Sequence, residues 1–222
     1  MENNVLWIIG IGVFCWTTLF LLLRKAFPKL SFELCNRLVA SSHAIVAVSL
    51  ASASVKNWSC PVCPLASKSS PQQMQTLAVS LSYLMYDSVC NLFEKQSKPD
   101  MAIHHLVSIV GIVSGLVNQR CGSEMVAGLW ITELSSPFLH IRDILKEFGI
   151  KDTALNLAAD IVFAMIFTFA RMIGGPYLTY VTLSAPNPLL IKGMALGLQL
   201  VSAFWFYKIL RMVSHKLNKL SS

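Results

Sequence analysis

Charged residues are scarce in this chain. Only 13% of its 222 residues are charged, and Asp and Glu together number 11. Soluble domains carry roughly 25% charged residues, which cover their water-facing surface. The scarcity excludes a soluble enzyme, and the 55% content of hydrophobic residues excludes an intrinsically disordered chain. Six Cys residues are also too few for a disulfide-dense secreted scaffold.

Long apolar runs are what the chain has instead. A helix needs about 20 apolar residues to cross a bilayer. Seven windows qualify: Val5–Leu23, Leu38–Val55, Gln72–Phe93, Met101–Asn118, Glu124–Ile141, Ala154–Ile173 and Leu189–Tyr207. The sequence therefore predicts an all-α polytopic membrane bundle of about seven transmembrane helices. Residues 1–30 would form the first helix and a basic turn, and residues 31–222 a six-helix membrane domain.

Prolines punctuate two of these windows. Pro137 removes a backbone donor within the fifth span and is expected to kink it beside Glu133. The run Gly174-Gly175-Pro176 is expected to end the sixth span.

The few basic residues predict the orientation of the bundle. With the N-terminus outside or in a lumen, thirteen fall on cytosolic loops and only four on the outer side. The cytosolic set is Arg24, Lys25, Lys29, Arg37, Lys95, Lys98, Arg142, Lys146, Lys151, Lys208, Arg211, Lys216 and Lys219, and the outer set is Lys56, Lys68, Arg120 and Lys192. This asymmetry is the positive-inside pattern, so the C-terminus is expected in the cytosol. Because these residues are dispersed over loops, no nucleic-acid partner is expected.

Two signals lie in the first outer loop. Asn57 begins the sequon Asn57-Trp58-Ser59 and is a candidate glycosylation site. The loop also contains Cys60 and Cys63, and Cys121 is on the same side, so a disulfide among these three is expected in an oxidising lumen. A zinc site needs four ligands. The Cys60–Cys63 motif would supply two of them, and neither a second CxxC motif nor a nearby His supplies the other two.

Ionisable residues inside spans are costly and mark functional positions. Asp87, His104, His105, His140 and Asp160 fall in the cytosolic half of the membrane, and Glu133 lies near its middle. At 100° per residue, Glu133, Ser136 and His140 share one helix face, and Asp160 and Arg171 share another. The sequence predicts a polar cavity, open to the cytosol, lined by Glu133, Ser136, His140, Asp160 and Arg171. The alternative is a set of interhelical hydrogen bonds that only lock the bundle.

Within this cavity, His104 beside Asp87 or Asp160 is the favoured centre for chemistry, whereas His105 is interpreted as a packing residue. Arg171 lies too far along the helix to pair with Asp160, so it either reaches toward the interface or meets another span. A metal is not expected, because the chain has only five His residues and lacks clustered histidine motifs.

Three segments together resemble a known family. They are Tyr86-Asp87-Ser88, Ile103-His104-His105-Leu106 and the stretch from Glu133 to Arg142, which reads ELSSPFLHIR. This combination resembles the TLC-domain family, which includes ceramide synthases, and the short chain is most similar to the small TLC-domain-containing membrane proteins, plant members among them. The resemblance extends from about Ser31 to the C-terminus.

In ceramide synthases the paired histidines lie at the acyl-transfer centre. The resemblance therefore implies His104, His105 and Asp87 as the catalytic residues if the protein is an enzyme. Ceramide synthases continue with an HD-x-x-D stretch, where this chain has His140-Ile141-Arg142-Asp143 and lacks the first aspartate. Ceramide synthesis itself is thus not expected.

The favoured function is lipid handling in lipid homeostasis, with membrane lipids as the partners and no cofactor. The alternative is an acyl-CoA-dependent lipid acyltransferase, with acyl-CoA as co-substrate. A transporter is less favoured, because no inverted repeat is visible in the sequence. The resemblance implies a multi-pass protein of the endoplasmic reticulum or another endomembrane.

Overall fold

The computed structural model describes residues 2–93, 99–150 and 153–221, and most of these residues are helical. Within these residues the only strand-like pairing is an isolated bridge between Lys68 and Arg120. Three predicted loop cations, Lys95, Lys98 and Lys151, lie outside the described residues.

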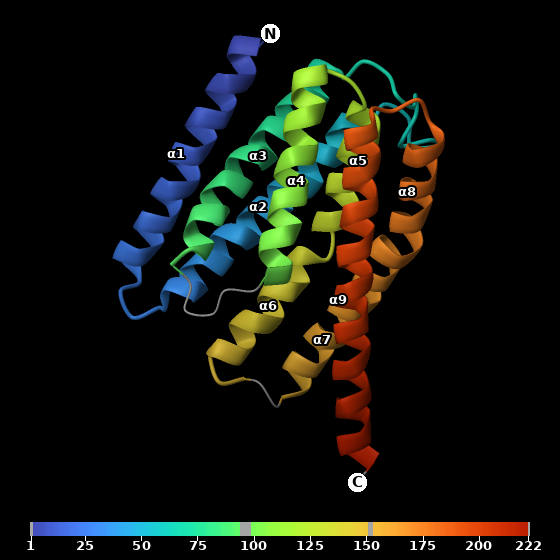
Figure 1. Cartoon of the computed structure of the whole chain (residues 1–222). Coiled ribbons are helices and arrows are strands. Elements are labelled where there is room, and N and C mark those ends of the chain that lie inside the picture. Colours follow the sequence, from blue (N-terminus) through green and yellow to red (C-terminus); the bar gives the residue numbers. More distant parts are fainter. Residues whose placement is uncertain (1, 94–98, 151–152, 222) are drawn as a thin grey trace.

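The chain passes up and down through a single bundle, with α6 continuing the direction of α5 and α8 that of α7, and the two termini lie at opposite ends (Figure 1). We call the end where the chain begins the upper end and the end where the last helix emerges the lower end. In chain order the elements are α1 (Glu2–Ala26), α2 (Phe32–Ser54), α3 (Pro71–Asn91), α4 (Pro99–Asn118), α5 (Gly122–Glu133), α6 (Ser136–Glu147), α7 (Ala154–Phe167), the π-helix η1 (Thr168–Gly174), α8 (Gly175–Ser184) and α9 (Leu189–Ser221).

Five segments of the described chain are long and apolar enough to cross a membrane: Asn4–Ala26, Phe32–Ser54, Pro99–Asn118, Ala154–Ser184 and Leu189–Ser214. The predicted all-α, polytopic membrane architecture is confirmed. The remaining two predicted spans correspond to α3 and to the α5–α6 pair, which pack among these five.

The α3 helix is less apolar because the bundle surrounds it. It packs against α1, α2 and α4, so its polar side chains face protein instead of lipid. Gln73, Thr76, Ser80 and Ser82 are all buried, and Trp16 of α1 donates a hydrogen bond from Nε1 to Ser82 Oγ at 3.1 Å. Low hydropathy here reflects an interior helix that forms interhelical hydrogen bonds.

Side-chain caps fix the starts of α2, α3 and α7. Ser31 accepts a hydrogen bond from the backbone N–H of Leu34 and caps α2. Ser70 and Gln73 form a reciprocal capping box at the start of α3. Thr153 caps α7 by accepting from the Asn156 N–H at 3.3 Å.

The fifth predicted span is broken. α5 ends at Glu133 and α6 begins at Ser136, and Pro137 occupies the first turn of α6. The proline ring cannot donate to the carbonyl of Glu133, so the regular helical hydrogen bond is absent at this point. The break lies in the middle of the bundle and redirects the chain beside Glu133.

The prediction that the sixth span ends at Gly174-Gly175-Pro176 is wrong. The helix continues through η1 into α8 and ends at Ser184. Pro176 lies in the first turn of α8, where a missing N–H is tolerated. The wider π-helical turn before it shifts the hydrogen-bond pattern, so the proline interrupts the α-helix without ending the span.

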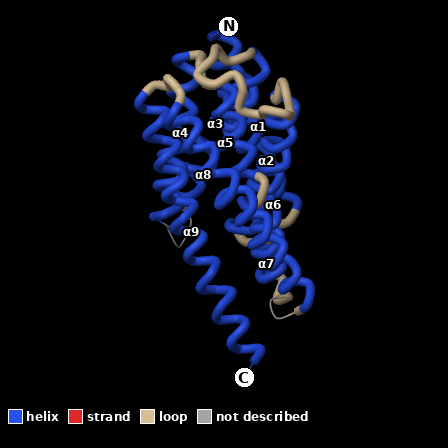
Figure 2. Tube along the Cα trace, turned by 90° about the vertical axis from the view of Figure 1, so that its right-hand side faces the viewer, coloured by secondary structure: helices blue, strands red, loops and turns tan. Residues whose placement is uncertain are grey.

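Two helices lie at the margins of the bundle. α1 packs against α3 and α2 but leaves Trp7 and Phe14 each 70% exposed, as expected of a lipid-facing helix. α9 extends beyond the lower end of the other helices (Figure 2). The interior between them, formed by α2 to α9, contains the candidate site.

Candidate functional site

A polar cavity of about 400 Å³ opens in the lower half of the bundle. Its polar and charged lining residues are Asn36, Arg37, Tyr83, Asp87, Asn91, Asp100, His104, His105, Glu133, Ser135, Ser136, His140, Arg142, Asp143, Arg171 and Lys208. The structure thus brings together seven of the residues proposed from sequence: Asp87, His104, His105, Glu133, Ser136, His140 and Arg171. Asp160 does not line the cavity but lies next to Arg142, which does.

Asp87 is the centre of a hydrogen-bond network that joins α2, α3 and α4. Its Oδ1 accepts from Asn36 Nδ2 at 2.9 Å, and its Oδ2 accepts from Asn91 Nδ2 at 3.2 Å. His105 Nε2 lies 3.3 Å from the same Oδ2. Tyr86 donates from its hydroxyl to Asn36 Oδ1 at 2.9 Å, which orients that amide.

The histidine that pairs with Asp87 is therefore His105, and this differs from the predicted pairing with His104. His105 Nδ1 lies 3.2 Å from Asn91 Nδ2, so both of its ring nitrogens have neighbours. If Nε2 carries the proton, it donates to the carboxylate while Nδ1 accepts from the amide. His105 is consequently fixed in place on both sides.

His104 is buried in a different environment. Its ring lies 5.0 Å from the ring of Trp205 on α9, and its Nδ1 has no hydrogen-bond partner among the described residues. It also lines a second cavity above the polar one. His104 is thus the member of the pair with an available ring nitrogen.

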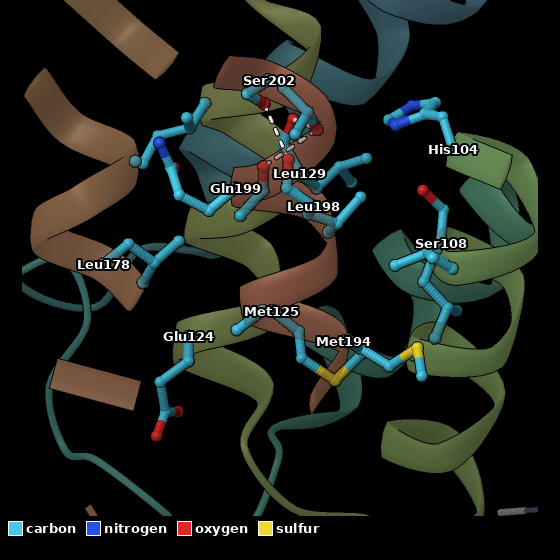
Figure 3. Close-up of a pocket in the computed structure, with 18 of the residues that line it drawn as sticks. His104, Ser108, Glu124, Met125, Leu129, Leu178, Met194, Leu198, Gln199 and Ser202 are labelled. Carbon is cyan, nitrogen blue, oxygen red and sulfur yellow. Dashed lines mark hydrogen bonds between the residues drawn. The ribbon is translucent and has the colours of Figure 1, made fainter. Parts of the chain in front are cut away.

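This second cavity, which we call the apolar chamber, has a volume of about 120 Å³. Figure 3 shows its walls: Leu129, Leu178 and Leu198 lie around it, Met125 and Met194 lie at one end, and His104 and Ser108 project from one side. Leu84, His104, Glu133 and Arg171 line both cavities. The two spaces therefore adjoin at these four residues.

Arg171 occupies this junction and is only 5% exposed. It belongs to η1, and its Nη2 donates to the backbone carbonyl of Thr132 in the last turn of α5. The guanidinium lies over the rings of Phe167 and Trp205, at 5.2 and 5.3 Å. Of the two positions considered from sequence, Arg171 meets another span.

Ion pairs join three helices at the mouth of the polar cavity. Asp143 of α6 pairs with Arg37 of α2 at 2.7 Å and with Arg142 at 3.1 Å. Asp160 of α7, which is buried, lies 3.4 Å from Arg142 and 3.8 Å from Lys146. The predicted cavity residue Asp160 thus acts as a counter-ion for the basic side chains of α6.

Sequence reasoning missed several residues of the site. Asn36 precedes the predicted second window, and the charge pattern of the sequence assigns Arg37 and Arg142 only to cytosolic loops. Trp205 donates from Nε1 to Asp100 Oδ2 at 2.6 Å, and Lys208 Nζ lies 2.9 Å from the same atom. These partners are more than 100 positions apart in the sequence, and no local pattern connects them. The sequence signal that could identify such residues is a weak one, namely a polar side chain within one turn of the end of a span.

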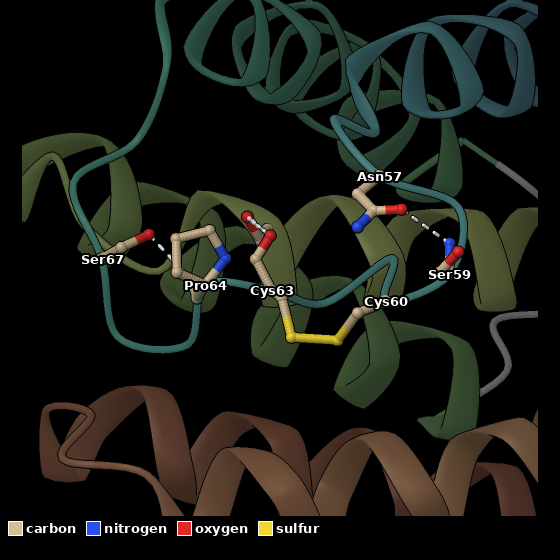
Figure 4. Close-up of a disulfide and its surroundings, with 7 residues drawn as sticks. Asn57, Ser59, Cys60, Cys63, Pro64 and Ser67 are labelled. Atoms are coloured by element: carbon tan, nitrogen blue, oxygen red, sulfur yellow. Dashed lines mark hydrogen bonds between the residues drawn. A yellow bond between two sulfur atoms is a disulfide. The ribbon is translucent and has the colours of Figure 1, made fainter.

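The upper end carries the loop with the paired cysteines. Cys60 and Cys63 form a disulfide (Figure 4). Cys121, the third candidate, is excluded from the disulfide in the structure: it is a free thiol that donates to Asn187 Oδ1 at 2.8 Å, and burial raises its pKa to about 11. Asn57 is exposed and its Oδ1 accepts from the Ser59 N–H at 2.9 Å, so its glycosylation stays a prediction.

A metal centre finds no support in the described part of the chain, where no three His, Cys, Asp or Glu side chains are grouped to hold an ion. The site is instead a polar cavity next to an apolar chamber.

Comparison with known proteins identifies the family. The sequence matches the TLC domain over residues 26–211. A TLC domain-containing protein of Acanthamoeba polyphaga mimivirus is 26% identical over 148 residues, which cover 64% of this chain and 73% of the viral protein. The resemblance derived from the histidine pair and the following span is confirmed. The chain belongs to the TLC domain family and is a multi-pass helical membrane protein.

Proposed function

We propose that the protein handles a membrane lipid within its bundle and acts in the lipid homeostasis of an endomembrane such as the endoplasmic reticulum. The observation that carries this proposal is the junction of the polar cavity and the apolar chamber at shared residues. A lipid has the same two-part character, with a polar head and an apolar chain. Its head would occupy the polar cavity and its chain the apolar chamber.

The lining chemistry supports this division. Ten Leu, Ile, Met and Val side chains line the chamber, alongside Gly, Ala and a set of polar residues. The polar cavity offers hydrogen-bond donors and acceptors from seven helical elements, α2 to α6, η1 and α9. Burying a chain in the chamber would stabilise the complex through the hydrophobic effect, and the polar groups would fix the orientation of the head.

Filling the chamber tests the proposal. Gly128 of α5 lines it, and an added Cβ would meet Leu178 Cδ2 at 3.6 Å, an ordinary contact. In Gly128→Leu the rest of the side chain would occupy space that the lipid chain needs. We expect several-fold less lipid to co-purify with this variant, measured by mass spectrometry of the detergent-solubilised protein.

The matched control is Gly10→Leu on α1, where an added Cβ meets no atom within 4 Å. This variant adds the same side chain away from both cavities and should retain the wild-type amount of lipid. Equal lipid content in wild type and Gly128→Leu would contradict occupation of the chamber.

A second candidate function, an acyl-CoA-dependent acyltransferase, is favoured by the available nitrogen of His104. In this reaction His104 would accept the proton of an acceptor hydroxyl while that oxygen attacks the thioester carbonyl. The carbon–sulfur bond then breaks, and coenzyme A leaves as a thiolate that takes the proton from the imidazolium. His105, engaged by Asp87 and Asn91, would position its neighbour without touching the reacting atoms.

Labelled oleoyl-CoA and mixed membrane lipids test this alternative on the purified protein. If it holds, His104→Gln should abolish transfer, and Ser49→Ala, at an exposed position on α2 outside both cavities, should retain most of it. Wild-type protein that co-purifies a lipid but transfers no label would exclude the acyltransferase and leave lipid handling in place.

A further inference from the structure

Several buried polar atoms around the apolar chamber have no hydrogen-bond partner. Within the described chain they belong to five residues that line it: His43, Ser80, His104, Glu124 and Arg171. A purely apolar ligand would leave all of these groups unsatisfied. A ligand with polar atoms at the correct position would satisfy some of them, and the charged group has the most to gain.

Arg171 is the outstanding case. Its Nε and Nη1 have no hydrogen-bond partner, although the side chain is 95% buried. In the described part of the chain no carboxylate forms an ion pair with it, whereas three acidic residues of the polar cavity have basic partners: Asp87 with His105, Asp100 with Lys208, and Asp143 with Arg37 and Arg142. Among the described residues no carboxylate is in direct contact with the guanidinium, so its two unpartnered nitrogens can donate to an anion.

The surroundings of Arg171 hold the guanidinium in a fixed position. The Phe167 and Trp205 rings lie against it, and the Thr132 carbonyl accepts from Nη2. Thr132 is close to the break between α5 and α6, and Arg171 itself belongs to the π-helical turn η1. π-Helical turns within α-helices occur frequently at functional sites. Two local departures from regular helix thus meet at one charged group.

Glu133 is the one acidic residue at the same junction, and it forms no ion pair with Arg171 in the described chain. The two side chains interact electrostatically but are not in direct contact. Glu133 therefore does not take the place of a counter-ion in direct contact with the guanidinium.

We propose that Arg171 binds the anionic oxygens of a lipid head group, a carboxylate or a phosphate, and that the attached chain enters the apolar chamber. This inference rests on the proposed function and adds the charge of the ligand to it. Guanidinium suits this ligand because its planar N–H donors match the geometry of carboxylate and phosphate oxygens. The anion would sit where the two cavities adjoin, with the charge at the head of the chain.

Three probes with the same 18-carbon oleyl or oleoyl chain test the proposal on the full-length protein in neutral detergent. They are oleate, oleoyl lysophosphatidic acid and oleyl alcohol, which differ at the head group. We expect wild type to bind at least one of the two anions at least ten-fold more tightly than the alcohol. In Arg171→Gln this preference should disappear, while the affinity for oleyl alcohol stays within about two-fold of wild type.

Arg211→Gln is the matched control, because it removes an equal charge from an exposed position on α9 outside both cavities. It should preserve the wild-type preference. If Arg171→Gln does not fold, Arg171→Lys replaces it: this variant keeps the charge but lacks the planar donors, and it should show a several-fold weaker preference for anions. An unchanged preference in Arg171→Lys would then overturn the proposal.

The outcomes separate this inference from the proposed function. Preferential binding of oleate identifies a carboxylate ligand, preferential binding of the lysophosphatidic acid identifies a phosphate, and either supports an anion site at Arg171. Equal binding of all three probes, unaffected by Arg171→Gln, overturns the anion site but leaves a lipid cavity. No binding of any probe contradicts the proposed function itself.

Discussion

The Asp87 carboxylate of α3 contacts side chains from two other helices. Asn36 on α2 donates a hydrogen bond to it, and His105 on α4 lies against it. Placing an ionisable group inside a membrane costs about 2.5–3.5 kcal/mol on insertion scales. The network offsets this cost, because the carboxylate in turn provides a partner for the buried side chains of Asn36 and His105. Asp87 is therefore as much a structural connection as a candidate for chemistry.

Replacing Asp87 by Asn tests this connection. The change removes the counter-charge of His105 and substitutes an amide N–H₂ for one acceptor, which faces the donor groups of Asn36 or Asn91. We expect destabilisation of about 1–3 kcal/mol, the usual cost of leaving buried polar groups unpaired. Thermal unfolding in detergent would show it as a lower midpoint.

Glu33→Gln, in the first turn of α2, serves as the control, because it removes one acidic charge near the same end of the bundle without touching the network. Its effect should stay near or below 1 kcal/mol, the range of a helix-dipole interaction. Similar midpoints for Asp87→Asn and wild type would mean that the Asp87 network contributes little to stability.

The sequence identifies His104 and His105 as candidates but does not tell which of them meets Asp87. Adjacent positions on a helix point about 100° apart, so the answer depends on the rotation of α4 about its axis. Packing against α9 sets that rotation: the His104 ring lies against Trp205, and His105 is turned toward α3. A contact between residues about 100 positions apart leaves no trace in local periodicity.

At the scale of helices, hydrophobic length predicts α1, α2, α4 and α9 because these elements contain long apolar runs. The extent of the sixth span could not be predicted, because a Gly-Gly-Pro run ends most helices. Here it does not, since η1 provides an alternative hydrogen-bond pattern ahead of Pro176. The sequence does predict an interruption between α5 and α6, because Pro137 removes a backbone donor within the span. At this proline the α-helix ends and a new one begins.

These two irregular helices explain the position of the junction. The α5–α6 break exposes a carbonyl at Thr132, and η1 presents Arg171 to it. Regular helices would satisfy their own backbone groups and would bring only side chains to the interior. The irregularities therefore create the polar point at which the cavity and the chamber meet.

At the scale of the whole molecule, the polar cavity and a group of basic residues lie at the same end of the bundle. Arg37, Arg142 and Lys208 line the polar cavity in the lower half of the bundle. Lys68 and Arg120 are paired in the bridge between the loops of the upper end, where the disulfide also lies. If the lower end faces the cytosol, as the positive-inside pattern predicts, a ligand enters the polar cavity from the cytosolic side.

Glycosylation reporters test this orientation. A sequon-bearing tag fused after Ser222 should remain unmodified, because the predicted C-terminus never enters the lumen. The same tag inserted in the loop between α2 and α3, next to Lys56, should be modified, and digestion with a glycosidase would show this as a mobility shift. A modified C-terminal tag, with an unmodified loop tag, would reverse the molecule in the membrane. It would then place the mouth of the polar cavity, together with Arg37 and Arg142, on the lumenal side. Acyl-CoA made in the cytosol cannot reach that side directly. The same experiment therefore also tests the acyltransferase alternative.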